Sequence, residues 1–585
     1  MRLILRYMKR YRGRISLSMC IKLAGAITEL FIPYILEYMI DDVAPLGRID
    51  LVLLWGALMV LTALLTRQLN VWANRIGVDN AHRVSYDVRQ DLFTKTANLS
   101  GTQFDAFGLP SLISRMTSDS YNVQGCVQSL QMMCVRVPIM LVGGIVVTLL
   151  MDAALASILC IITPILIVVV LAVSRRGIPL YRKVQEKLDG VVRVMREDIT
   201  GIRVVKALSK TEYEKRRFAG YNDEMTHSDI TASTVMAIPG PFMQMCLNIG
   251  LTLVVWVGAV RVNAGAMQPG VILAFLTYFN MVMQAVMGIN RIFMMLSKAT
   301  ASANRIERVL ATEPDQRVLL PEEAKTPAGD EFIRFEHVNF SYSGVAPGSE
   351  DSFAGEEREQ CLYDISFALR RGESLGIIGP TGCGKTTIIN LLMRFYDVED
   401  GGVFVDGRDV RTYEKDELHR KFGVVFQNDM VFYNSLRENI RFGRNLDEGD
   451  LMRAVEDAAA AEYISSLEEG LDYQADIGGA NLSGGQKQRL LISRALAGDP
   501  EILILDDSSS ALDYKTDAAL RKAIFEHHGG STTIMVAQRV SSIQQMTHIL
   551  VMEEGHCIGY GTHQELLGTC PAYREIYKAQ MGALA

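Results

Sequence analysis

Six apolar stretches in the first half of the chain constrain its fold more than any other feature of the sequence. Each is close to the ~20 residues that an α-helix needs to cross the hydrocarbon core of a bilayer. They cover about 15–42, 51–75, 130–151, 153–174, 238–262 and 271–296. We therefore expect six transmembrane helices.

The distribution of basic residues predicts how these helices are oriented. Lys and Arg are frequent in Met1–Arg14 and in the two long connections, about 76–129 and 175–237, but nearly absent from the three short connections. The positive-inside rule places the N-terminus, both long connections and the second half of the chain in the cytoplasm. We expect the spans to continue into the cytosol as long helices, with short helices near 104–112 and 204–212 that contact a soluble domain. Met1–Arg14 is predicted to lie on the membrane surface as an amphipathic helix.

Composition supports a protein that is part membrane and part soluble. The chain has 585 residues, of which 49% are hydrophobic and 21% charged, so several domains are expected. The net charge of −7 offers no basic footprint, which argues against nucleic acid as a partner. None of the nine cysteines has CxxC spacing, so neither a zinc site nor a disulfide framework is indicated.

One carboxylate inside the membrane is a candidate substrate-binding group. Glu29 lies near the middle of the first span, with Lys22 nearer the cytoplasmic side and Glu37 toward the outside. Charges at this depth are costly and usually functional. Glu29 either pairs inside the bundle for structural reasons or attracts a cationic substrate, and the sequence leaves both interpretations open.

The second half reads as a soluble α/β domain. A polar, proline-containing stretch at 313–330 is typical of a linker, and it separates a transmembrane domain at 1–312 from a domain at 331–585. The predicted fold class is a six-helix transmembrane domain followed by an α/β P-loop nucleotide-binding domain.

A phosphate-binding motif opens this second domain. Gly379–Thr386 reads GPTGCGKT and has the G-x-x-x-x-G-K-[ST] spacing of a P-loop, between an apolar strand-like run and a helical one. Its glycines allow backbone N–H groups to surround phosphate oxygens. We expect Lys385 to reach the β- and γ-phosphates and Thr386 to hold Mg²⁺. The candidate nucleotide-binding residues here are Gly379, Pro380, Thr381, Gly382, Cys383, Gly384, Lys385, Thr386 and Thr387.

An acidic pair ends a strand further along the chain. The apolar run 502–505 leads into Asp506 and Asp507, about 120 residues after the P-loop. This is the Walker B arrangement, and Asp506 is suited to bind Mg²⁺ through water.

Between these two motifs lies Leu482–Gln486, which reads LSGGQ. The chain thereby resembles the ATP-binding cassette (ABC) transporters, whose signature this is, and the order of six spans then cassette resembles a bacterial half-transporter of the exporter type. The resemblance covers nearly the whole chain and implies ATP and Mg²⁺ as cofactors. It also implies roles for further residues, namely adenine stacking by Tyr342, Mg²⁺ sensing by Gln427, and binding of the opposite cassette's γ-phosphate by Ser483, Gly484, Gly485 and Gln486.

Two departures from the family pattern concern catalysis. Asp507 stands where hydrolytic sites of the family carry a glutamate base, and Gln538 stands where they carry a switch histidine. The aspartate carboxylate is one methylene shorter, and a ~1 Å misplacement can cost ~10²-fold in rate. Glutamine cannot become a cation, and lost acid–base help costs ~10²–10⁴-fold. We expect this chain's own P-loop site to hydrolyse ATP slowly or not at all.

The function implied by the resemblance is ATP-driven export of an amphipathic small molecule, such as a drug, a lipid or a peptide-like compound. The chain would be one half of a heterodimer in the cytoplasmic membrane of a bacterium, with its LSGGQ segment completing the active site of a second half-transporter. Three alternatives remain: a homodimeric lipid flippase, a regulatory ATP-binding subunit, and an importer of metal chelates with the exporter-type fold.

Overall fold

The computed structural model of the chain contains two compact units. The first comprises Met1–Ala97 and Leu112–Thr312, and the second comprises Asn98–Ser111 and Glu313–Ala585. The structure describes residues 1–342, 360–508 and 512–581.

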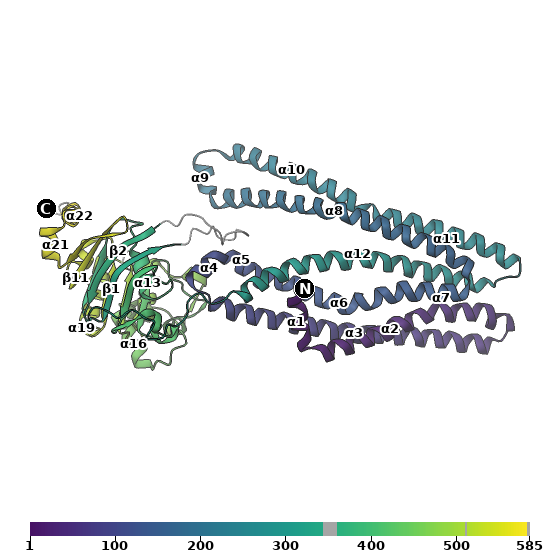
Figure 1. Cartoon of the computed structure of the whole chain (residues 1–585), viewed down its shortest axis with the longest axis horizontal. Coiled ribbons are helices and arrows are strands. Elements are labelled where there is room, and N and C mark those ends of the chain that lie inside the picture. The colour runs from purple at the N-terminus through teal and green to yellow at the C-terminus, as the bar shows by residue number, and fades with distance from the viewer. Residues whose placement is uncertain (343–359, 509–511, 582–585) are drawn as a thin grey trace. The chain divides into compact units, whose positions relative to one another are not determined.

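The first unit is helical (Figure 1). Its helices are α1 (Arg2–Arg10), α2 (Arg12–Tyr38), α3 (Ile49–Ala97), the second half of α5 (Leu109–Ser114), α6 (Ser120–Pro138), α7 (Gly144–Met151), α8 (Ala153–Thr200), α9 (Ile202–Ala207), α10 (Thr211–Ala237), α11 (Pro239–Asn263) and α12 (Pro269–Ala311). Among the described residues, six helical segments are long and apolar enough to cross a membrane, which confirms the predicted six-span architecture.

Several helices are much longer than a bilayer requires. Helix α3 has 49 residues and α8 has 48, against the ~20 that cross the hydrocarbon core. Helices α8 and α10 lie side by side and are joined through α9 into a long hairpin (Figure 1). The polar ends of these helices therefore extend well beyond the apolar segments.

Helix α1 packs against other helices of the first unit, and its position at a membrane surface stays a prediction. It is amphipathic, but its apolar residues Leu3, Ile4 and Tyr7 are buried in the protein. The hydroxyl of Tyr7 donates to Asp91 of α3 at 2.7 Å. The sequence pattern does not distinguish burial against lipid from burial against protein, and here the carboxylates of α3 draw the helix onto the bundle.

Hydrogen bonds join the first span to the last. The hydroxyl of Tyr278 in α12 donates to the carbonyl of Leu30 in α2 at 2.6 Å. At the end of α2, the carboxylate of Asp41 accepts the backbone N–H groups of Gly270 and Val271 at 2.6 and 3.1 Å. Asp41 thereby satisfies N–H groups at the start of α12 that have no partner within the helix.

The second unit is built on a sheet of ten strands within the described residues, in the order β5-β4-β1-β2-β12-β11-β3-β10-β9-β6. The strands are β1 (Ile333–Ser341), β2 (Gln360–Leu369), β3 (Ser374–Ile378), β4 (Asp400–Val405), β5 (Arg408–Asp409), β6 (Phe422–Val425), β9 (Ile502–Asp506), β10 (Thr532–Val536), β11 (His548–Glu553) and β12 (His556–Gly561). A separate pair is formed by β7 (Asn434–Ser435) and β8 (Gln474–Ala475).

Parallel pairing places the nucleotide motifs together. Strands β11, β3, β10, β9 and β6 are parallel neighbours in that order. The carboxyl ends of adjacent parallel strands lie at one edge of the sheet, where ligands of open α/β sheets bind. The P-loop follows β3, the acidic pair ends β9, and Gln538 follows β10, so all three reach this edge.

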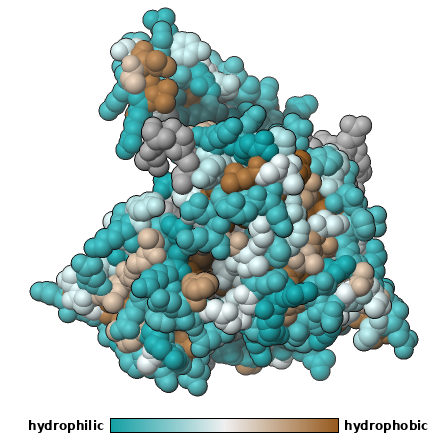
Figure 2. Space-filling model, turned by 90° about the vertical axis from the view of Figure 1, so that its left-hand side faces the viewer, coloured by the Kyte–Doolittle hydropathy of each residue, from teal (hydrophilic) through white to brown (hydrophobic). Residues whose placement is uncertain are grey.

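Helices cover both sides of this sheet. They are α13 (Lys385–Leu392), α14 (Lys415–His419), α15 (Leu436–Arg441), α16 (Glu448–Asp457), α17 (Ala461–Ser465), α18 (Gly484–Leu496), α19 (Tyr514–His527), α20 (Val540–Ile543), α21 (His563–Thr569) and α22 (Pro571–Met581). The face shown in Figure 2 is mainly hydrophilic, with hydrophobic residues in small groups, as a water-exposed domain requires.

Helix α4 (Gly101–Phe107) belongs to the second unit although it is distant in sequence. The N–H of Gly101 donates to the carbonyl of Phe395 at 3.0 Å, and the hydroxyl of Tyr396 donates to Asp105 at 2.6 Å. A Cβ on Gly101 would lie 2.8 Å from the Phe395 carbonyl oxygen, so the close approach depends on glycine. The first of the two short helices expected to contact the soluble domain therefore does so.

Candidate nucleotide-binding site

The P-loop joins β3 to α13 through glycines that no other residue could replace. Gly384, the residue before α13, has φ +97°, and a Cβ there would lie 2.6 Å from Leu362. A Cβ on Gly379 would lie 2.2 Å from the carbonyl oxygen of Met552. The loop is therefore held close to neighbouring strands in a conformation that leaves its N–H groups free to face a ligand.

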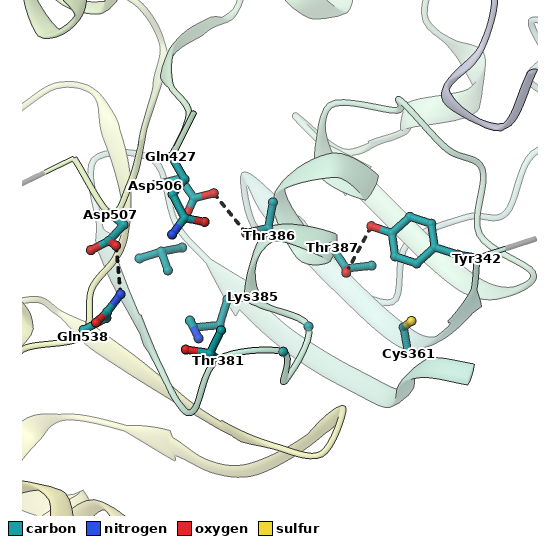
Figure 3. A pocket seen from close by; sticks show the side chains of 13 residues that line it. Tyr342, Cys361, Thr381, Lys385, Thr386, Thr387, Gln427, Asp506, Asp507 and Gln538 are labelled. Carbon is teal, nitrogen blue, oxygen red and sulfur yellow. Dashed lines mark hydrogen bonds between the residues drawn. The ribbon is translucent and has the colours of Figure 1, made fainter. Parts of the chain in front are cut away.

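A pocket lies over this loop (Figure 3). It is lined by Tyr342, Cys361, Thr381, Gly382, Gly384, Lys385, Thr386, Thr387, Gln427, Asp506, Asp507, Val536 and Gln538. The ammonium of Lys385 donates to the carbonyl oxygens of Gly379 and Pro380 at 2.9 and 2.7 Å, so it is bent over the loop. Phosphate oxygens would compete for these N–H donors, since charge-assisted hydrogen bonds are the stronger ones.

A buried carboxylate faces the first residues of α13. The hydroxyl of Thr386 donates to Asp506 at 3.1 Å, and Asp506 is only 2% exposed. The pKa of Asp506 is raised overall, mainly because the carboxylate is buried, and the nearby charge of Asp507 adds to this. The hydrogen bond from Thr386 and the charge of Lys385 act in the opposite direction. The hydroxyl of Thr386, the amide oxygen of Gln427 and the carboxylate of Asp506 are oxygen donors of the kind that Mg²⁺ prefers.

Asp507 and Gln538 form a hydrogen-bonded pair near Asp506, at the side of the pocket opposite Tyr342 (Figure 3). The amide nitrogen of Gln538 donates to the carboxylate of Asp507 at 2.9 Å. Asp507 has φ +49°, a left-handed conformation that aspartate adopts more readily than most residues. The amide is neutral at every pH, so it orients the carboxylate without exchanging a proton with it.

The ring of Tyr342 is fixed at the rim of the pocket. Its hydroxyl donates to Thr387 at 3.2 Å, and its ring makes edge contacts with Phe340 and Tyr396 at centroid distances of 4.9 and 5.2 Å. The structure thus places a rigid aromatic group beside the P-loop, and its role in adenine stacking stays a prediction.

The LSGGQ residues lie elsewhere in the cassette. Ser483 and Gln486 form a capping box at the start of α18, in which the N–H of Gln486 donates to the Ser483 hydroxyl at 3.3 Å and the N–H of Ser483 to the Gln486 amide oxygen at 2.8 Å. None of the four residues 483–486 lines the P-loop pocket in the described part of the chain. The signature therefore lies on a separate surface of the cassette, and its binding of phosphate stays a prediction.

Two residues that the sequence motifs did not indicate line the pocket, whereas the side chain of one predicted P-loop residue, Cys383, does not. Cys361 of β2 and Val536 of β10 line the pocket, although neither belongs to a motif; Val536 could have been noted as the end of the apolar run before Gln538. Cys383 is buried under the loop with only 3% exposure. It contributes its backbone to the loop while its thiol faces the protein.

In the first unit, the candidate substrate residue has a partner from its own chain. Glu29 accepts two hydrogen bonds from the guanidinium of Arg136, at 2.8 and 3.3 Å. Its charge is therefore opposed by a cation within the bundle.

Comparison with known proteins agrees with this geometry. Residues 15–286 match the family model described as the ABC transporter transmembrane region, and residues 362–510 match the model described as ABC transporter. The chain is 32% identical to an ABC transporter ATP-binding protein of Mycobacterium tuberculosis over 99% of this chain and 98% of that relative. It belongs to the ABC transporter family.

Two further similarities concern the activity of one relative and the fold of one solved structure. The chain is 27% identical to an ATP-dependent lipid A-core flippase of Syntrophus aciditrophicus, over 99% of this chain and 94% of that protein. A bacterial Atm1-family ABC exporter with ATP bound shares the fold with a TM-score of 0.80 at 21% identity, covering 97% of this chain and 99% of that one. The chain is thus an ATPase-coupled, multi-pass membrane transporter of the ABC family, and its fold is that of an ABC exporter.

Proposed function

We propose that this chain is the degenerate-site half of a heterodimeric exporter of amphipathic small molecules. The observation that carries the proposal is the hydrogen bond from Gln538 to Asp507. The carboxylate that would activate water is short by one methylene and is already engaged by a group that cannot become cationic. Lost acid–base help of this kind costs ~10²–10⁴-fold in rate.

The intact signature supports the same division of labour. Ser483–Gln486 keeps the LSGGQ sequence at the start of a capped helix but does not line its own chain's pocket. It would complete the site of a second cassette, and turnover would occur there. Apolar residues of α9 and its end, Ile202, Val204 and Leu208, are 44%, 61% and 64% exposed, which leaves surface for a second subunit to cover.

We also infer that Thr386, Gln427 and Asp506 hold Mg²⁺ beside the bound nucleotide. Substitution Asp506→Asn should leave ATP binding without Mg²⁺ little changed and remove most of the gain on adding Mg²⁺, because the buried carboxylate is the charged ligand. Equilibrium binding of a fluorescent ATP analogue with and without Mg²⁺ measures this. Substitution of the exposed Asp364 is the matched control and should preserve the gain.

Unequal losses of turnover from two substitutions test the heterodimer. The tagged chain is purified from its own bacterium, so that any partner is retained, and ATP turnover is measured in lipid. Ser483→Arg should lower turnover by about 10²-fold or more, because it removes donors from the working site. Lys385→Met should lower it by far less. In a homodimer both substitutions would disable both sites, and equal losses would contradict the proposal.

A homodimeric lipid flippase is the second candidate function. The relative named as an ATP-dependent lipid A-core flippase, which aligns over nearly its whole length, favours it. Purification of a single polypeptide species with full turnover would support this candidate over the heterodimer.

A further inference from the structure

Three charged side chains from two membrane-spanning helices lie together in the first unit. Glu29 of α2 is bound by Arg136 of α6 through two hydrogen bonds. Lys22, two turns earlier in α2, is buried, and its ammonium donates to the amide oxygens of Asn70 and Asn74 of α3 at 2.8 and 3.1 Å. We call Lys22, Glu29 and Arg136 the charge cluster.

The charge cluster is not neutral. Seven residues make about two turns, so Lys22 lies on the same face of α2 as Glu29, roughly 10 Å along the axis, and Glu29 in turn is bonded to Arg136. Two cations therefore share one carboxylate, and that carboxylate is hydrogen-bonded to Arg136. No carboxylate in the described part of the chain lies within ion-pair distance of Lys22, whose amide partners solvate the ammonium without offsetting its charge. A net positive charge inside an apolar bundle is costly unless an anion joins it.

Arg136 can accept such an anion. Its side chain is 46% exposed, and the bonds to Glu29 use its Nε and one terminal nitrogen. A guanidinium has five N–H donors in a planar fork, so donors remain for a second oxyanion.

Apolar side chains surround this position. The core next to Glu29 and Arg136 includes Leu30, Val137 and Met140, with the partly buried Met133, Met281 and Ile289 packed against it. Unbranched methionines adapt to ligands of different shape. The surroundings of the cluster therefore suit an apolar chain attached to a charged head.

We propose that the charge cluster binds the anionic head of an amphiphile, such as a phosphorylated or carboxylated lipid-like molecule. The sign is opposite to that of the cationic substrate considered for Glu29 alone, because the carboxylate is outnumbered by its cationic neighbours. The proposal deepens the proposed export function, since it specifies the charge of the exported molecule, but binding itself needs no ATP turnover.

Equilibrium binding in the absence of nucleotide tests this. The protein, with any partner that copurifies, is placed in nanodiscs of zwitterionic phosphatidylcholine. Binding of dodecyl phosphate is compared with that of dodecyltrimethylammonium and of inorganic phosphate. We expect dodecyl phosphate to bind at least about tenfold more tightly than either, because charge-assisted hydrogen bonds favour the anion and the chain favours the apolar surroundings. If inorganic phosphate bound as tightly as dodecyl phosphate, the proposal that the ligand is an amphiphile would be wrong. If dodecyltrimethylammonium bound more tightly, the proposal that the ligand is an anion would be wrong.

Substitutions of opposite effect assign the binding to the cluster. Lys22→Gln should weaken dodecyl phosphate binding about tenfold, while Lys22→Arg should preserve it. Glu29→Gln should strengthen binding, because it removes the competing carboxylate from Arg136, and a gain of affinity does not arise from misfolding. Arg48→Gln, which removes an exposed cation paired with Asp50, is the matched control and should have no effect.

An unchanged affinity in Lys22→Gln, or a loss in Glu29→Gln, would overturn the proposal. Neither result depends on which subunit hydrolyses ATP. Failure of this inference is therefore distinguishable from failure of the heterodimer, which is judged by turnover of the Ser483 and Lys385 variants.

Discussion

Asp507 and Gln538 face each other across one hydrogen bond, and their replacement should restore hydrolysis at this chain's own P-loop. In the proposed heterodimer, Ser483→Arg disables the site that this chain's signature completes. Within that background, Asp507→Glu plus Gln538→His should raise phosphate release by about 10²-fold or more, because the base regains its length and the switch its cation. Single-turnover phosphate release measures this gain. Asp507→Asn plus Gln538→His is the matched control, and an equal rise there would show that the carboxylate is not the base.

At the same scale, motifs predicted residues only where neighbours in sequence are neighbours in space. The P-loop and the acidic pair are each a contiguous segment of sequence, so Lys385, Thr386 and Asp506 could be assigned from their motifs. The structure brings these three residues into one pocket. Cys361 enters that pocket because the start of β2 lies against Gly384 of the P-loop, and Arg136 meets Glu29 because α2 and α6 pack together. Neither contact leaves a local pattern in the sequence.

At the scale of elements, a titratable link joins the ends of two helices. Asp457, the last residue of α16, is bound by His527 at 2.5 Å and by His528 at 3.0 Å, both at the end of α19. The hydrogen bond that His527 donates to Asp457 raises the pKa of His527 above its ordinary value, and the charges of Asp457 and Glu526 add to this while burial opposes it. The resulting stabilisation is complete below the unfolded pKa of about 6.5 and is lost as pH rises through the raised pKa.

The cassette should therefore lose stability relative to an Asp457→Asn variant over the pH interval that begins at about 6.5 and extends upward through the raised pKa of His527. Thermal unfolding midpoints of the full chain across this interval measure the slope. His556, which stacks on Tyr363, is the matched control, and His556→Asn should keep the slope of the unmodified protein. A slope that persists in Asp457→Asn would contradict the assignment.

Helix α4 is held by a hydrogen bond to a carboxylate, which is stronger than one between neutral groups. Tyr396→Phe removes the hydroxyl that binds Asp105, and bonds of this kind contribute about 1.5–3 kcal/mol. Amide hydrogen exchange in residues 101–107 should become about tenfold faster or more. Phenylalanine at the exposed Tyr433 serves as the control and should leave exchange in α4 unchanged.

At the scale of the whole molecule, the order of the domains could be predicted from the sequence. The contacts between distant segments inside each domain could not. Each span is a continuous apolar run, so six spans could be recognised one at a time. The order of the ten strands in the described sheet depends on pairing between distant segments. The same holds for α4, whose residues join the unit formed by Glu313–Ala585. Local patterns therefore predicted the elements, and tertiary packing decided their neighbours.

The carboxylate of Asp41 binds backbone groups that are synthesised long after it. Its nearer partner, the N–H of Gly270, lies 229 residues further along the chain. At roughly 5–20 residues per second, a ribosome needs about 10–50 s to reach that point after α2 has emerged. During this interval the first span, α2, is in the bilayer before the start of α12, which Asp41 will cap, has been synthesised. The last span to be made thus completes the first, and a chain released before residue 270 should be recognised by proteases as an unfinished bundle.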